Sequence, residues 1–101
     1  MDTNDLITHT RSRFDYAASK RTLKEKYQGK LVFGHNGSMF KATPEMIAFL
    51  SLYNNDKVVI VDLYENPVEV AANELCDIMR NKLQQQMNAW LLEYQELNKN
   101  K

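Results

Sequence analysis

The sequence contains few of the residues that break or cross-link a chain. Its 101 residues include three glycines, two prolines and one cysteine. Scarce Gly and Pro predict regular secondary structure joined by short turns. The single cysteine, Cys76, excludes an internal disulfide and is typical of a reducing compartment. We therefore expect one cytoplasmic domain that spans residues 1–101.

The sequence also lacks net charge and long apolar runs. Thirteen basic residues balance thirteen acidic ones, which excludes a histone-like attraction of the whole molecule to nucleic acid. The longest apolar stretches, 46–50 and 58–61, are far shorter than the ~20 residues that cross a bilayer. Residues 1–10 carry no export signal. Because 44% of the residues are apolar, we expect a folded protein without membrane contact.

No pattern of catalytic or metal-binding residues is present. The two histidines, His9 and His35, fall on separate predicted elements. His35 is expected at the surface of a turn, and Cys76 is expected to be a small buried apolar residue. Asp62 and Glu65 lie near a turn, where we expect solvated carboxylates. The sequence therefore predicts no enzyme, and no catalytic, cofactor-binding or metal site.

A helix is predicted at residues 4–26, where Thr3 or Asn4 supplies a capping side chain. One side of it carries apolar and small residues at helical spacing: Leu6, Ile7, Thr10, Phe14, Ala17 and Ala18. A different side carries Tyr16, Leu23 and Tyr27. Because the apolar stripe changes sides, we expect this helix to dock firmly at only one end.

A β-hairpin follows, centred on Asn36-Gly37, a pair that is typical of a type I′ turn. Folding about this turn pairs Phe33 with Phe40 and Leu31 with Ala42. These four side chains share one face, which we expect to point to the core.

Residues 43–53 fit two structures. Thr43-Pro44-Glu45 is a strong helix start, whereas the apolar residues that follow also suit a buried strand. A strand is predicted at residues 57–64, which include four consecutive β-branched residues. Residues 67–70 alternate with period two and predict a short strand, with the start of the last helix as the alternative.

A long amphipathic helix is predicted at residues 72–98. Its length would be about 40 Å, whereas a compact domain of this size has a diameter of about 26 Å. We therefore expect the far end of its apolar stripe to contact another chain. The predicted oligomer interface comprises Leu83, Met87, Trp90, Leu91, Tyr94 and Leu97.

The charges are unevenly distributed along the chain. Residues 11–30 contain seven basic and two acidic residues, and residues 45–96 contain nine acidic and three basic ones. The basic half faces solvent or binds phosphates. The candidate nucleic-acid contacts are Arg11, Arg13, Lys20, Arg21, Lys24 and Lys30.

The order of these elements resembles that of the Sm/LSm-like small β-barrel. The strands that carry the resemblance are Lys30–His35, Ser38–Ala42, Met46–Tyr53, Lys57–Tyr64 and Pro67–Val70. The fold class that follows is α+β: an N-terminal helix, a strongly bent antiparallel sheet of four to five strands, and a long C-terminal helix. The uridine-reading motifs of Sm proteins are not present, because their places hold residues 43–46 and 65–67.

A second resemblance covers residue 30 to the C-terminus. The stretches 41–50, 58–62 and 66–70 are similar to small uncharacterised proteins of tailed marine cyanophages, which implies a location in the host cytoplasm. We expect a non-enzymatic protein that self-associates or binds a partner helix, in the role of a phage accessory or assembly factor. The alternative is an Sm-like protein that binds RNA or single-stranded nucleic acid through residues 11–30.

Overall fold

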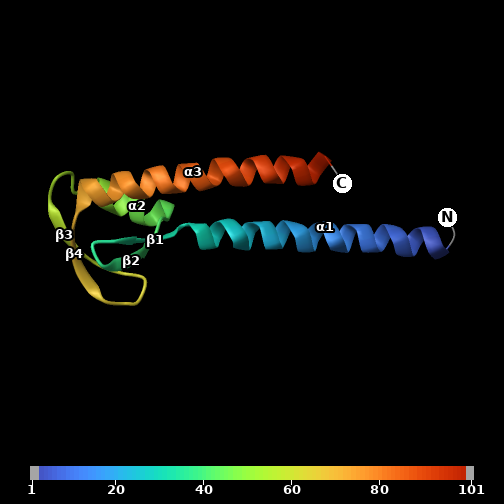
Figure 1. Cartoon of the computed structure of the whole chain (residues 1–101), viewed down its shortest axis with the longest axis horizontal. Helices are drawn as coiled ribbons and strands as arrows, with labels where there is room; N and C mark the ends of the chain where they lie inside the picture. The colour runs from blue at the N-terminus through green and yellow to red at the C-terminus, as the bar shows by residue number, and fades with distance from the viewer. Residues whose placement is uncertain (1–2, 100–101) are drawn as a thin grey trace.

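The structure is a computed structural model that describes the backbone of residues 3–99 and the side chains of residues 15–99. A small α+β head lies at one end, and two helices extend from it side by side (Figure 1). The molecule measures 66 × 24 × 20 Å. The elements in chain order are α1 Thr3–Lys30, β1 Val32–His35, β2 Ser38–Lys41, α2 Pro44–Ser51, β3 Lys57–Val61, β4 Pro67–Ala71 and α3 Ala72–Lys99.

The first hairpin forms as the sequence predicts. Asn36 and Gly37 adopt positive φ angles of 50° and 81°, as a type I′ turn requires. Phe33 is opposite Phe40, and the Ala42 N–H donates to the Leu31 carbonyl at 2.9 Å. Leu31, Phe40 and Ala42 are buried in the core, and Phe33 packs against it. The predicted core face is therefore confirmed.

Residues 44–51 form a helix, so the strand predicted at Met46–Tyr53 is wrong. Thr43 is the N-cap, and its hydroxyl oxygen accepts the Met46 N–H at 3.2 Å while Pro44 occupies the first turn. Met46, Ile47 and Leu50 have helical spacing and pack in or against the core. The capping signal therefore outweighs the β propensity of the apolar residues.

The second hairpin pairs β3 with β4, which confirms the short strand predicted at residues 67–70 against the helical alternative. β3 ends at Val61 rather than at Tyr64. The Asp62 carboxylate oxygen Oδ1 accepts the backbone N–H groups of Tyr64 and Asn66, each at 2.9 Å. Asp62 is therefore largely buried and closes the turn, where we expected a solvated carboxylate.

The predicted four- to five-stranded barrel is wrong. The strands form two separate two-stranded sheets, β1–β2 and β3–β4. A barrel needs a continuous ladder that closes on itself. Here the third predicted strand is the helix α2, which interrupts the ladder between the two hairpins. The α+β class is retained, with long helices at both ends of the chain.

The core of the head joins β2, α2, β3, β4 and α3. It consists of Leu31, Phe40, Ala42, Leu50, Ile60, Val70, Ala72, Leu75, Cys76 and Met79. The first turns of α3 supply four of these residues, so α3 anchors both hairpins and α2. The rest of α3 leaves the head as the predicted long helix, and α1 runs along it in the opposite direction (Figure 1). None of the described helices contains an apolar stretch long enough to span a membrane.

Candidate protein-interaction site on the helical arm

The two long helices form an arm in which α1 packs on α3. Leu23 and Tyr27 of α1 are buried, and Trp90 of α3 is half-buried. The rings of Tyr27 and Trp90 are stacked, with centroids 6.4 Å apart and planes inclined by 9°. Parallel aromatic rings at this separation add about 0.5–1.5 kcal/mol to the burial of their surface. This contact ties the middle of α3 to α1.

One flank of the arm is closed by a polar cluster around Glu93. Its Oε1 accepts hydrogen bonds from Lys26 Nζ at 2.7 Å and from the Tyr27 hydroxyl. These two donors hold the pKa of Glu93 below its ordinary value. The hydrogen bond to Glu93 in turn raises the pKa of Lys26 and that of Tyr27. All three groups therefore keep their neutral-pH protonation states, and this flank is polar.

The outer end of the described arm is held by Tyr16. Its hydroxyl donates to Asn98 Oδ1 at 2.5 Å. Desolvation, together with a hydrogen bond to Tyr94, raises the pKa of Tyr16. The α1 backbone continues past the end of α3 (Figure 1). The two helices therefore stay in contact to the last turn of α3.

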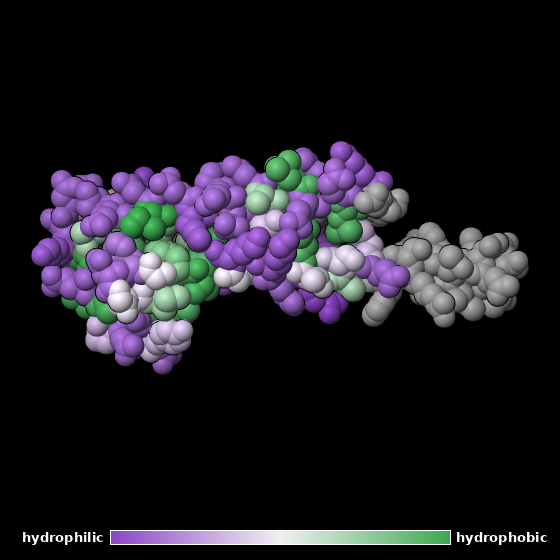
Figure 2. Space-filling model, in the orientation of Figure 1, coloured by the Kyte–Doolittle hydropathy of each residue, from purple (hydrophilic) through white to green (hydrophobic). Residues whose placement is uncertain are grey.

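The opposite flank of the arm is an open apolar groove of about 320 Å³. Met87, Trp90, Leu91 and Tyr94 line it, and Lys20 and Lys24 of α1 stand at its edge. Met87 is 43% exposed and Leu91 53%. Figure 2 shows apolar side chains emerging among polar ones along the edge of the arm where α3 runs. The groove is the part of the arm that α1 leaves uncovered.

The stretch of α3 that supplies Met87, Trp90 and Leu91 to this groove carries no charge. Residues 83–92 contain no acidic or basic side chain, although 26% of the whole sequence is charged. Gln84 and Asn88, exposed on this stretch, hydrogen-bond to each other at 2.9 Å. Loss of charged residues beside exposed apolar ones is a feature of protein interfaces rather than of solvated helix faces. We call residues 83–92 the uncharged segment.

The structure divides the six residues predicted as an oligomer interface into two groups. Leu83, Trp90, Tyr94 and Leu97 are half-buried, whereas Met87 and Leu91 are exposed. The prediction compared the length of the last helix with the diameter of a compact domain. The radius of gyration is 19.4 Å, against about 13 Å for a compact domain of this length. In the extended molecule α1 shelters much of the stripe, and a second chain is needed only for the groove side.

The basic residues proposed for nucleic-acid binding do not share one face. Lys20 and Lys24 lie at the groove, whereas Lys30 has its Nζ 5.0 Å from the centre of the Tyr27 ring, near the Glu93 cluster. Arg21 is exposed. The side chains of Arg11 and Arg13 lie outside the described residues. Nucleic-acid binding by this set stays a prediction.

Comparison with known proteins gives no family. No family model, no curated protein and no solved structure matches this chain.

The titratable residues of the head have structural contacts. Cys76 is buried, as expected, with its Sγ 3.6 Å from the Ile47 carbonyl oxygen. The side chain of His35 is only 14% exposed, and its Nε2 lies 4.0 Å from Glu74 Oε1 on α3. His35 is thus more enclosed than a surface turn residue. Within the described part of the chain, no three His, Cys, Asp or Glu side chains converge on a possible metal position.

Tyr16, Leu23 and Tyr27 were predicted to share one side of the first helix, but the packing of this side on α3 was not predicted. Leu23 and Tyr27 do not belong to the main apolar stripe of the predicted helix; they lie on the second side, with Tyr16. Of that stripe, Ala17 is exposed and Ala18 half-buried, and the side chains of Leu6, Ile7, Thr10 and Phe14 lie outside the described residues. The signal was available: Tyr16, Leu23 and Tyr27 follow the i, i+7, i+11 spacing of a helix face.

Proposed function

We propose that this protein is a non-enzymatic interaction protein that self-associates through its helical arm. The observation that supports it is the groove of α1 and α3, where exposed Met87 and Leu91 adjoin the uncharged segment. The occupant is the same groove of a second copy. Each arm then supplies the layer that the other lacks.

The number of helical layers in the arm favours a second copy as the occupant. Two packed helices form a single layer with an open side, and helical domains become stable when such layers stack into a four-helix bundle. The molecule is 20–24 Å across its two shorter axes, so the arm has no third helix of its own. Two arms related by a two-fold axis would place apolar grooves together. The uncharged segment of α3 brings no repulsion to this contact, and the charges at the groove are those of Lys20 and Lys24 on α1.

The test compares two adjacent leucines. Leu91 lines the groove, whereas Leu92 is 65% exposed and points about 100° further round the helix. Leu91→Gln is expected to weaken self-association by about tenfold or more, as for an interface residue that contributes over 1.4 kcal/mol. Leu92→Gln is the matched control and should leave the affinity unchanged. Light scattering and sedimentation over a dilution series measure both.

A wild-type chain that stays at 11.8 kDa at every concentration, with its helices intact, would contradict the proposal. Equal effects of Leu91→Gln and Leu92→Gln would contradict the choice of the groove face. The narrower role of a phage accessory or assembly factor stays a prediction.

A further inference from the structure

The outer edge of β3 is an unused hydrogen-bonding edge from Lys57 to Val61; past its end, the Leu63 N–H donates to the Met39 carbonyl of β2 at 2.8 Å. In the β3–β4 ladder, the Asp62 N–H donates to Asn66 and the Ala72 N–H donates to Asp56. Because bonded positions alternate along an antiparallel strand, the even-numbered residues of β3 face β4. The N–H and C=O groups of Lys57, Val59 and Val61 therefore point outward. Among the described residues, no hydrogen bond reaches these outward groups.

The side chains on this edge are apolar and exposed. Val59 is 64% exposed and Val61 57%, on the face of the hairpin that points away from the core. Natural proteins normally protect an edge strand with a charge, a proline or a covering element. Here the strand has one charge, Lys57, at its first position. An edge with this composition is suited to pairing with another strand.

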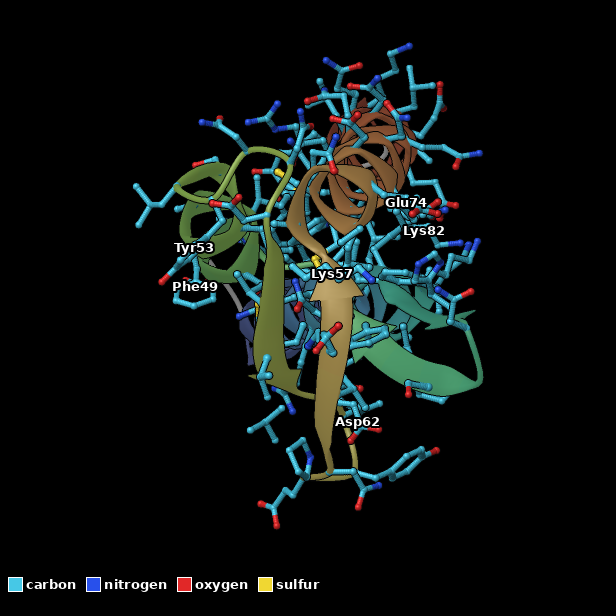
Figure 3. All side chains as sticks on the ribbon, turned by 90° about the vertical axis from the view of Figure 1, so that its left-hand side faces the viewer. Phe49, Tyr53, Lys57, Asp62, Glu74 and Lys82 are labelled. Carbon is cyan, nitrogen blue, oxygen red and sulfur yellow. The ribbon has the colours of Figure 1, made fainter. Side chains whose placement is uncertain are left out.

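A groove runs beside this edge. It has a volume of about 340 Å³ and is lined by Val59, Ile60 and Val61 of β3 with Thr43, Glu45, Met46 and Phe49 from around α2. Phe49 is 40% exposed and contacts Tyr53, with ring centroids 5.1 Å apart. In Figure 3 both rings point outward from α2, away from α3. A strand added to β3 would find an apolar wall on this side.

We propose that the β3 edge pairs with the β3 edge of a second copy, antiparallel and centred on Val59. In this register Val59 lies opposite Val59 of the second copy, and Lys57 lies opposite Val61. Every outward N–H and C=O group of the strand then has a partner. No like charges face each other, and the two two-stranded sheets become one four-stranded sheet.

Charge supports the same occupant. In this register each Lys57 lies opposite Val61 of the other copy, beside the other copy's groove. Glu45 is one of the residues that line that groove. Lys57 Nζ lies 3.9 Å from Glu69 Oε1 within its own chain, with 75% of its side chain exposed, so it is free to turn toward a second carboxylate. The two-fold axis creates this Lys57–Glu45 contact twice.

This contact does not rest on the arm, because it uses the opposite end of the molecule. A chain with two different two-fold contacts joins copies alternately by arm and by head. The result is an open row of molecules rather than a closed dimer.

The experiment uses the full chain with Leu91→Gln, which weakens the arm contact, at concentrations too low for the weakened arm contact to form. Sedimentation and light scattering are expected to show a concentration-dependent dimer for this variant. Adding Val59→Lys should make it monomeric, because two lysines would face each other at the axis. Adding Lys57→Glu instead should weaken the dimer by about tenfold through two repulsive contacts, and Glu45→Lys in the same chain should restore it. The control is Leu52→Lys, a residue 75% exposed outside the groove, which should change nothing.

A monomer in the Leu91→Gln background, a dimer that survives Val59→Lys, or a charge swap that fails to restore it would each overturn the proposal. Binding of an extended synthetic peptide by a chain that remains monomeric would assign the edge to a foreign strand and also overturn it. If Leu91→Gln has no effect on the wild-type assembly while Val59→Lys alone abolishes it, the arm proposal fails and this one stands.

Discussion

The phenol ring of Tyr27 lies parallel to the indole of Trp90, inclined by 9° with the centroids 6.4 Å apart. The stack connects α1 with α3, and its two residues are 63 positions apart in the sequence. Tyr27 also donates to Glu93, one turn beyond Trp90. A single side chain of α1 therefore contacts two successive turns of α3.

Trp90→Ala is expected to destabilise the arm more than the head. Burying a Trp fully is worth about 3–5 kcal/mol, and Trp90 is half-buried, so we expect a loss of about 2 kcal/mol. Native-state hydrogen exchange should become faster along residues 16–30 and remain slow in the β1–β2 hairpin. Leu92→Ala is the control. Uniform acceleration across the head would show that arm and head unfold as one unit.

Acid should loosen the arm through Glu93. Its pKa is lower in the folded chain, because Lys26 and Tyr27 donate to the carboxylate. A lowered folded pKa stabilises the fold above the unfolded pKa, about 4.3, and this stabilisation is lost as the pH falls through the folded value. Glu93→Gln should therefore flatten the pH dependence of urea unfolding below about pH 4.3.

Glu96→Gln is the matched control for this titration. Glu96 pairs with Lys99 on the same helix, so its loss should leave the acid dependence of the arm in place. Equal flattening by both variants would remove Glu93 from the explanation.

Two glycines should respond in opposite directions to alanine. Gly37 has φ of +81° in the hairpin turn, where an L-residue costs about 1–2 kcal/mol. Gly29 lies in α1 with nothing within 4 Å of an added Cβ, so Gly29→Ala should stabilise by up to about 1 kcal/mol. Thermal unfolding followed by circular dichroism measures both shifts. A stabilising Gly37→Ala would contradict the turn assignment.

The head depends on the first turns of α3. Leu75 is fully buried in the core shared by both hairpins and α2. Leu75→Ala should cost about 2–5 kcal/mol in urea unfolding, whereas Leu52→Ala, at a residue 75% exposed, should stay within about 0.5 kcal/mol. A small effect at Leu75 would show that the head core repacks.

Local signals in the sequence predicted the local structure well. Asn36-Gly37 defined the turn and the register of the first hairpin, because a two-residue loop leaves one pairing, which places Leu31, Phe33, Phe40 and Ala42 on the core face. The C-terminal helix was correct within one residue at its end. Thr43-Pro44 predicted the start of a helix, but the residues after it were assigned to a strand. Helix and strand compete over a short apolar run, and the packing of α2 on α3 decides between them.

The tertiary arrangement could not be predicted in the same way. The barrel was inferred from the order of elements, and order does not say which strands share a ladder. The packing of α1 along α3 was not predicted, because the expected diameter was that of a compact domain. Met87 and Leu91 were among the predicted interface residues. That they are exposed while Trp90 and Tyr94 are half-buried depends on where α1 lies, which the sequence pattern does not show. The β3 edge was not predicted at all, because the pattern of residues 57–61 reads the same for a central and an edge strand.

The chain has one tryptophan, and the stack with Tyr27 places it on the arm, away from the core of the head. Its fluorescence therefore reports on the separation of α1 from α3 and is blind to the hairpins. Because Trp90 also lines the groove, a titration at concentrations where the chain is monomeric would follow the opening of the arm, with no dye or label attached.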